Sequence, residues 1–323
     1  MIRSRSLGGW VTGVILLTLL STPAASAPPR FAVELDLVTV NVAVTNPRTR
    51  AFENGLGQEA FVVLEDGIPQ QLVMFEQERL PIEVTLLIDN SNSMHPRLPA
   101  VKAAARRLIA ALRPQDRARV VQFNHRMEIL QDFTASHDKL GAAVDSVKVA
   151  GATGLYNALY LSLKDLRARR SAAEPCRHAI VVLSDGADTA SLVTDDQVLQ
   201  QARKSDVSVY AIGLGATRHA ADASDTKAAY FLTALTRDTG GEAFFPRTLA
   251  ELDGVYGRIA DELRTQYTLG YVSSNPRRDG AWRSVAVQTV GGAALVRHRT
   301  GYYAPRDRGG SPVLAAGGGG GGR

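Results

Sequence analysis

The chain has 323 residues, of which 45% are hydrophobic and 21% are charged. This balance is typical of a globular protein with one or two buried cores, and it excludes a largely disordered chain. The formal net charge is +5, but the basic residues are scattered and form no stripe with interleaved aromatic residues, which argues against nucleic-acid binding.

Residues 1–27 have the order of features of a secretory signal peptide. Two arginines precede the apolar stretch Trp10–Leu20, and the small residues Ala24–Ala27 follow it. Because this stretch is shorter than the roughly 20 residues that span a bilayer, we expect a cleaved signal rather than a membrane anchor. Cys176 is the only cysteine, so no intrachain disulfide is expected. We predict a secreted or periplasmic protein.

Residues 31–80 are predicted to form an N-terminal β region. Apolar residues alternate with polar ones along 38–44, which is the period of a β-strand. Two further apolar runs, Phe61–Leu64 and Gln71–Phe75, lie on either side of Asp66–Gly67, a hairpin signal. We expect a loop slightly longer than two residues at this hairpin because Ile-Pro follows the glycine.

Residues 81–265 change to the pattern of an α/β domain. Four nearly continuous apolar runs have the length of strands covered on both faces: Val84–Ile88, Val120–Phe123, Ala179–Leu183 and Val207–Ile212. Amphipathic helical patterns lie between and after them: Leu98–Leu112, Leu155–Leu166, Asp195–Lys204, Ala228–Thr239 and Leu249–Arg264. Strands that alternate with helices predict a doubly wound, mostly parallel sheet. The polar segment Ala216–Thr226 has no period and is predicted to be an exposed loop.

Strand patterns return in residues 266–305, and the glycine-rich tail, residues 306–323, is predicted to be disordered. The C-terminal strands either complete one sandwich with the strands of residues 31–80, which would make the α/β domain an insertion, or form a separate β module. The predicted fold class is therefore α/β, with flanking antiparallel, sandwich-like β regions.

Oxygen-bearing side chains follow two of the predicted α/β strands at their carboxyl ends. Asp89 ends the first run, and Ser91 and Ser93 follow it at every second position. Asp185 follows the third run, and Thr153 lies in a glycine-flanked loop that opens a helix. Ligands of open α/β sheets bind beyond the carboxyl ends of the strands, so we expect these five side chains to converge. Two carboxylates and three hydroxyls are hard donors that suit Mg²⁺, or alternatively Mn²⁺ or Ca²⁺.

The same residues resemble the metal-ion-dependent adhesion site of von Willebrand factor type A domains. The motif DxSxS of that family reads DNSNS from Asp89 to Ser93, and Thr153 in GATGLYNAL and Asp185 in VVLSDGAD follow it. The resemblance covers roughly residues 81–263 and implies a Rossmann-like fold. It also implies an adhesion-type function in which the metal binds an acidic residue of a protein partner. The flanking segments LEDGIPQ and TGYYAP resemble exported bacterial proteins with a related domain.

The same residues are also compatible with two functions other than metal-dependent adhesion. In the first, the chain is a structural or assembly module in which the metal only stabilises loops. In the second, it is a metal-dependent hydrolase, which would need a general base beside the metal. The histidines have no HExxH spacing, and no GxSxG nucleophile motif is present. We therefore expect no enzymatic activity. The resemblance to the adhesion site implies a protein ligand that supplies a carboxylate.

Overall fold

A computed structural model describes residues 36–77, 80–169, 176–185, 188–215 and 223–306. The predicted signal peptide lies outside these ranges, and so does the predicted tail after its first residue. Within the described ranges, no helix combines the length and the apolar character that crossing a lipid bilayer requires.

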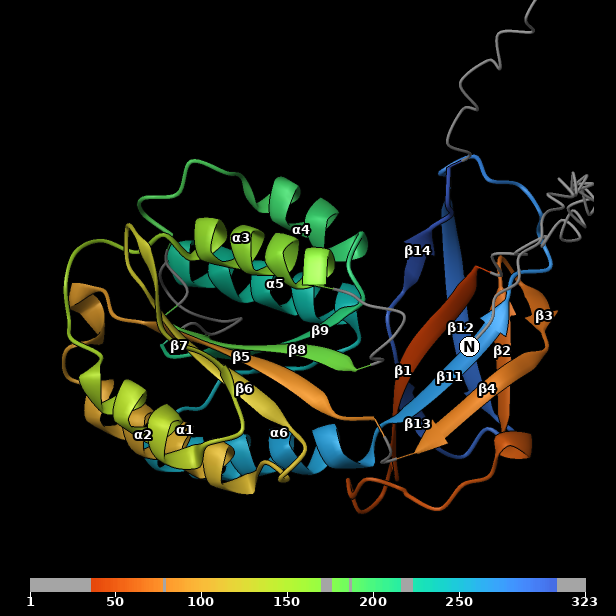
Figure 1. Ribbon diagram of the computed structural model, residues 1–323, viewed down its shortest axis with the longest axis horizontal. Helices are drawn as coiled ribbons and strands as arrows, with labels where there is room; N and C mark the ends of the chain where they lie inside the picture. The colour runs from red at the N-terminus through yellow and green to blue at the C-terminus, as the bar shows by residue number, and fades with distance from the viewer. Residues whose placement is uncertain (1–35, 78–79, 170–175, 186–187, 216–222, 307–323) are drawn as a thin grey trace, which may run out of the picture. The chain divides into compact units, whose positions relative to one another are not determined.

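A six-stranded sheet forms the centre of the α/β part, in the order β10-β9-β8-β5-β6-β7 (Figure 1). Its strands are β5 (Ile82–Asp89), β6 (Arg117–Phe123), β7 (Met127–Thr134), β8 (Arg177–Ser184), β9 (Val207–Gly213) and β10 (Ala243–Phe244). All neighbouring strands are parallel except β6 and β7. β8 is buried along its whole length, as its continuous apolar run predicts. The predicted mostly parallel sheet is confirmed.

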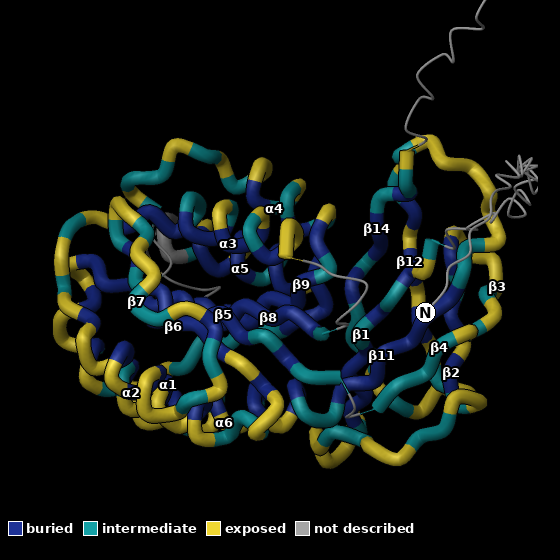
Figure 2. The backbone as a smooth tube through the Cα atoms, in the orientation of Figure 1, coloured by how far each residue is buried: buried dark blue, intermediate teal, exposed yellow. Residues whose placement is uncertain are grey.

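Helices cover both faces of this sheet, and exposed residues lie on their outward sides (Figure 2). One face carries α1 (Leu98–Ala111), α2 (His137–Ser146) and α6 (Leu252–Thr265). The other face carries α3 (Leu155–Arg169), α4 (Asp195–Arg203) and α5 (Ala223–Thr239). Three short 3-10 helices are η1 (Gln58–Ala60), η2 (Asn92–Met94) and η3 (Leu249–Glu251). Along β5, Leu86 and Ile88 enter one core and Leu87 the other, because successive strand residues point to opposite faces.

The sequence pattern indicated neither β7 nor α2. β7 is an edge strand in which only Phe133 is fully buried, so its apolar residues do not alternate cleanly. α2 is short, and its start is fixed by the Ser136 hydroxyl, which accepts a hydrogen bond from the backbone N–H of Lys139. The loop expected over residues 216–226 is also partly wrong, because α5 already begins at Ala223. Residues 216–222 lie outside the described part of the chain.

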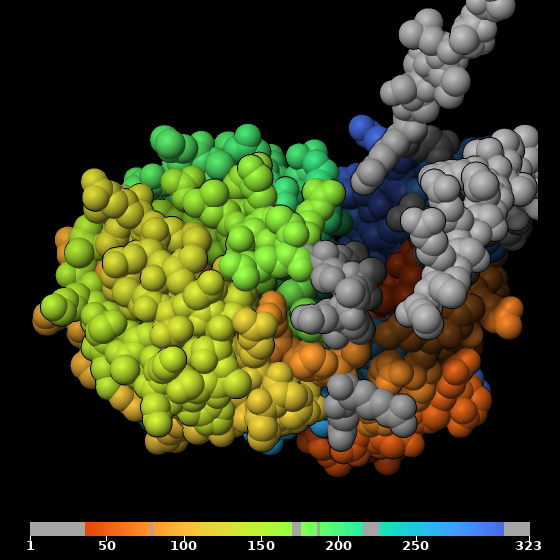
Figure 3. All heavy atoms as spheres, in the orientation of Figure 1, coloured from red at the N-terminus to blue at the C-terminus, as the bar shows by residue number. Residues whose placement is uncertain are grey.

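Two four-stranded sheets form the β part, in the orders β13-β1-β11-β4 and β14-β12-β2-β3. Their strands are β1 (Leu37–Thr45), β2 (Phe61–Glu65), β3 (Ile68–Gln70), β4 (Leu72–Gln77), β11 (Tyr267–Val272), β12 (Trp282–Thr289), β13 (Leu295–Arg297) and β14 (Gly301–Tyr303). β1 pairs with β11 and β2 pairs with β12, so each sheet joins strands from before and after the α/β part. In the space-filling view, red-orange N-terminal atoms and blue C-terminal atoms therefore lie against each other (Figure 3). Val40, Val63 and Tyr267 belong to one core between the sheets.

The hairpin at Asp66–Gly67 is tighter than the sequence led us to expect. Both residues have positive φ, 48° and 82°, and β2 pairs with β3 directly across them. Positive φ at both central residues is the requirement of a two-residue type I′ turn, so the expectation of a longer loop is wrong. The next run is not part of this hairpin, because β4 pairs with β11 in the other sheet.

Candidate metal centre

Asp89 is the last residue of β5, at the carboxyl edge of the sheet, and it is fully buried. Its Oδ1 accepts a hydrogen bond of 2.9 Å from the backbone N–H of Ser91. Its Oδ2 accepts one of 2.6 Å from the hydroxyl of Ser184, the last residue of β8. The carboxylate is thus held from both sides, by its own loop and by the neighbouring strand.

Ser91 and Ser93 continue this loop with their hydroxyl groups directed toward each other. Their Oγ atoms are 3.1 Å apart. Ser91 is buried, whereas Ser93 is exposed, so the pair extends from the buried carboxylate toward solvent. Two neighbouring ligands of an octahedral Mg²⁺, with bonds of about 2.1 Å, lie about 3 Å apart. The observed separation therefore fits two ligands of one ion.

Thr153 lies in a loop that is hydrogen-bonded to the loops after β5 and β8. The Asn92 N–H donates to the Gly151 carbonyl at 3.0 Å, which joins this loop to the one that carries the serines. The Thr153 carbonyl accepts hydrogen bonds of 2.9 Å from the N–H groups of Thr189 and Ala190, after β8. Gly151 has φ +74°, a left-handed conformation that glycine adopts readily. Backbone contacts thus fix the three loops to one another.

Asp185 directly follows β8 and supplies a second carboxylate. Its Oδ2 lies 3.8 Å from Arg97 Nη1. Its Oδ1 is buried and has no hydrogen-bond partner among the residues that the structure describes. Burial raises the pKa of Asp89, and the charge of Asp185 raises it further, although hydrogen bonds from Ser184 and Ser91 act in the opposite direction. A cation beside both carboxylates would stabilise their charged forms.

The strand order explains why Asp89 and Asp185 lie at the same edge of the sheet. After β5 the chain continues to β6 on one side, whereas β8 lies on the other side of β5. Asp89 and Asp185 therefore lie on either side of the point where the strand order reverses, which is where open α/β sheets bind ligands. All five predicted donors are oxygen atoms, as Mg²⁺, Mn²⁺ and Ca²⁺ require. The residues present fit such an ion.

Three residues that the sequence pattern did not indicate contact the candidate ligands or their loops. Ser184 orients Asp89, and only the register of β5 against β8 reveals that the two residues are neighbours. Arg97 forms an ion pair of 3.8 Å with Asp185. The Asn90 side chain donates to the Lys148 carbonyl at 2.6 Å and fixes the first loop.

Comparison with protein families finds a match in the part of the chain that carries this site. Residues 84–187 match the model of the von Willebrand factor type A domain. The chain contains a von Willebrand factor type A domain. The matched range of this type A domain includes Asp89, Ser91, Ser93, Thr153 and Asp185.

Individual proteins with similar sequence or structure were also found. Over 111 residues the chain is 32% identical to an uncharacterized protein of Synechocystis, and the match covers 33% of this chain but only 26% of that protein. The vWF domain of the pilus tip protein Mfa5 from Porphyromonas gingivalis is 15% identical, with a TM-score of 0.47 over 57% of this chain and 95% of that one. A von Willebrand factor type A protein from Catenulispora acidiphila is 13% identical, with a TM-score of 0.48 over 84% and 74%.

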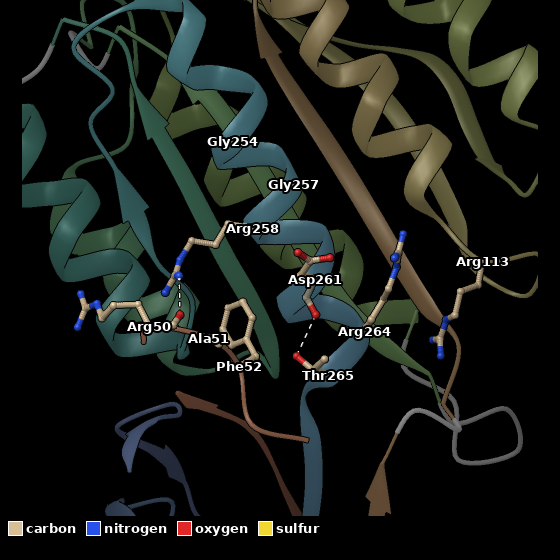
Figure 4. Close-up of a pocket in the computed structure, with 10 residues that line it drawn as sticks. All are labelled: Arg50, Ala51, Phe52, Arg113, Gly254, Gly257, Arg258, Asp261, Arg264 and Thr265. Atoms are coloured by element: carbon tan, nitrogen blue, oxygen red, sulfur yellow. Dashed lines mark hydrogen bonds between the residues drawn. The ribbon is translucent and has the colours of Figure 1, made fainter. Parts of the chain in front are cut away.

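A cavity of about 690 Å³ lies elsewhere, along α6 (Figure 4). It is lined by Arg50, Ala51, Phe52, Arg113, Gly254, Gly257, Arg258, Asp261, Arg264 and Thr265. Arg258 donates to the Arg50 carbonyl at 3.2 Å and lies 5.0 Å from the ring centre of Phe52. This cavity contains none of the predicted metal ligands of the type A domain, so it is separate from the loop site.

Proposed function

We propose that the type A domain binds a divalent cation, Mg²⁺ or alternatively Mn²⁺ or Ca²⁺, through Asp89, Ser91, Ser93, Thr153 and Asp185. One observation carries the proposal. The buried Asp89 carboxylate lies in the electrostatic field of Asp185, and one buried oxygen of Asp185 has no hydrogen-bond partner among the described residues. Two like charges in a buried site are unfavourable unless a cation joins them.

The proposed function is adhesion-type binding of a partner protein. When bound, the cation would supply an open coordination position for a carboxylate oxygen of that partner. Ser93 is exposed at the outer end of the donor set, so an incoming side chain has access from that side. Arg97, beside Asp185, adds a positive charge that favours an acidic ligand. This proposal includes no enzymatic reaction.

We further propose that the chain is exported and that its two ends build one β platform. The signal-like features of residues 1–27 support export. The pairing of β1 with β11 and of β2 with β12 supports a platform made of residues 31–80 and 266–305, with the α/β domain of residues 81–265 inserted between them.

A purely structural role for the metal is the second candidate. The backbone hydrogen bonds between the three loops favour it, because an ion there would also hold the loops together. Removal of metal by EDTA distinguishes the two. Loss of partner binding with the fold intact supports adhesion, whereas unfolding supports the structural role.

Selection of peptides tests the adhesion proposal directly. A random peptide library is captured on the immobilised protein in Mg²⁺ and eluted with EDTA, in parallel with the Asp89→Ala variant. We expect the wild-type eluate to be enriched in peptides that contain Asp or Glu. Replacement of that Asp by Asn, or of that Glu by Gln, in a selected peptide should abolish its capture. Capture that is unchanged in EDTA or in Asp89→Ala would refute the proposal.

A further inference from the structure

Three side chains with metal-binding atoms gather at the amino ends of β5 and β8, the opposite end of these strands from the loop site. Glu83 is the second residue of β5, and His178 is the second residue of β8. The parallel register places the two residues directly beside each other. Cys176 stands two positions before His178. One ligand atom from each residue lies within 4.8 Å of the other two.

The spacing of these atoms is close to that of a loaded site. Cys176 Sγ lies 3.7 Å from His178 Nε2, and Glu83 Oε2 lies 3.6 Å from His178 Nδ1. In a tetrahedral zinc site, the usual bond lengths place a sulfur and a nitrogen ligand about 3.6 Å apart. The thiol and the imidazole therefore need little movement to share an ion. The carboxylate can bind that ion or orient the imidazole through its other nitrogen.

The surroundings of the cluster favour a zinc-type ion over magnesium. Thiolate sulfur and imidazole nitrogen are ligands that Zn²⁺ prefers, whereas Mg²⁺ prefers oxygen. His178 is 7% exposed and the Glu83 side chain 14%, so the ligands are largely shielded from water. Cys176 is half-buried, so its thiol is not enclosed in the core. Arg117 Nη1 lies 3.2 Å from Glu83 Oε1, so one carboxylate oxygen of Glu83 is already paired and the other faces His178.

We propose that Glu83, Cys176 and His178 form a second metal site, for Zn²⁺, that is independent of the site at Asp89. Binding converts the Cys176 thiol to a thiolate and releases its proton to solvent. The ion would join the start of β8 to the start of β5. Arg177 lies between Cys176 and His178 in the sequence, and its side chain donates to the Leu263 carbonyl of α6 at 2.9 Å. The start of β8 is therefore also in contact with the last helix. The ion would therefore stabilise the place where the chain enters the α/β sheet.

Co²⁺ is the probe for this site, because a thiolate bound to Co²⁺ gives a charge-transfer band in the near ultraviolet. The full chain is titrated with Co²⁺ and then with Zn²⁺, in excess Mg²⁺ and with a non-thiol reductant. We expect one Co²⁺ per chain with this band, which Zn²⁺ abolishes. Cys176→Ser should lose the band and bind Zn²⁺ at least tenfold more weakly, and Glu83→Gln should weaken Zn²⁺ binding to a smaller extent.

The control variant is Asp89→Ala, which should keep the band and the Zn²⁺ affinity, so this result does not depend on the proposed adhesion site. Circular dichroism verifies the fold of each variant, and wild type with an alkylated thiol replaces Cys176→Ser if that variant does not fold. Absence of the thiolate band in wild type, or equal Zn²⁺ affinity in wild type and in the thiol-blocked protein, would overturn the proposal.

Discussion

At the scale of single residues, the core of the β part contains an ion pair of which both side chains are buried. The Glu65 carboxylate lies 3.0 Å from Arg283 Nη1, and both side chains are at most 3% exposed. The hydroxyls of Tyr271 and Tyr302 donate to the same carboxylate at 2.9 and 2.8 Å. Burial alone would raise the pKa of Glu65, but the hydrogen bonds from Ser273, both tyrosines and Arg283 together lower it below the ordinary value. Removal of one partner leaves a buried charge without its counter-ion.

Glu65→Ala should therefore lower the free energy of unfolding by about 3 kcal/mol, the scale measured when one partner of a buried ion pair is removed. The change is measured by urea denaturation followed by circular dichroism. The matched control is Asp253→Asn, which removes an exposed partner of Arg107 and should stay within about 1 kcal/mol of wild type. Equal losses in both variants would contradict the role assigned to Glu65.

The same carboxylate makes stability depend on pH. Because the pKa of Glu65 is lowered in the folded state, folding favours the charged form, and this contribution is complete above the ordinary value of 4.5. It is lost as pH falls through the lower pKa of the folded state. We expect the difference in the free energy of unfolding between wild type and Glu65→Gln to shrink as pH decreases below 4.5. A difference that stays constant across this range would show that the charge of Glu65 is not responsible.

At the scale of elements, long patterned segments were predictable and peripheral ones were not. β5 and β8 are nearly continuous apolar runs because both of their faces are buried, and α1 has apolar residues at the helix period because one whole face of it is buried. β7 buries only Phe133, and α2 is a short helix of ten residues, so neither segment carries a long pattern in its own sequence. The candidate ligands could be singled out because four of them lie at or just after strand ends and Thr153 lies in a loop that opens a helix. Their binding of a metal stays a prediction. Ser184 could not be singled out, since its contact with Asp89 depends on the register of two strands that are far apart in sequence.

The close approach of two loops gives a prediction at this scale. A Cβ atom on Gly154 would lie 2.7 Å from the Asn124 carbonyl oxygen, which also accepts the Gly154 N–H at 2.8 Å. Gly154→Ala should displace the loop that carries Thr153 and weaken Mg²⁺ binding roughly tenfold, as the loss of supporting contacts around metal sites does. Isothermal titration calorimetry measures this affinity.

The matched control for this substitution is Gly257→Ala in α6, where a Cβ would meet no atom within 4 Å. Because alanine favours a helix over glycine, this variant should gain about 0.5–1 kcal/mol in the free energy of unfolding and keep its Mg²⁺ affinity. Unchanged Mg²⁺ affinity in Gly154→Ala would indicate that the loop position does not determine binding.

At the scale of the described part of the chain, buried charges join the α/β part to the β part. Glu262 of α6 is fully buried, accepts a hydrogen bond from Tyr210 of β9 at 2.8 Å and pairs with Arg297 of β13. Burial raises the pKa of Glu262, and the charge of Arg297 acts against this rise. Such contacts join residues far apart in sequence, and periodicity does not reveal them. For the same reason, the sequence left open whether the terminal strands share sheets.

Five side chains from three loops are proposed to hold one divalent cation. Diffraction from crystals grown with Mn²⁺ tests this proposal, because the anomalous signal locates the ion without reference to protein geometry. We predict a peak within bonding distance of the Ser91 and Ser93 hydroxyls that is absent in crystals of Asp89→Ala. A map without a peak between these loops, or a peak that persists unchanged in the variant, would contradict the claim.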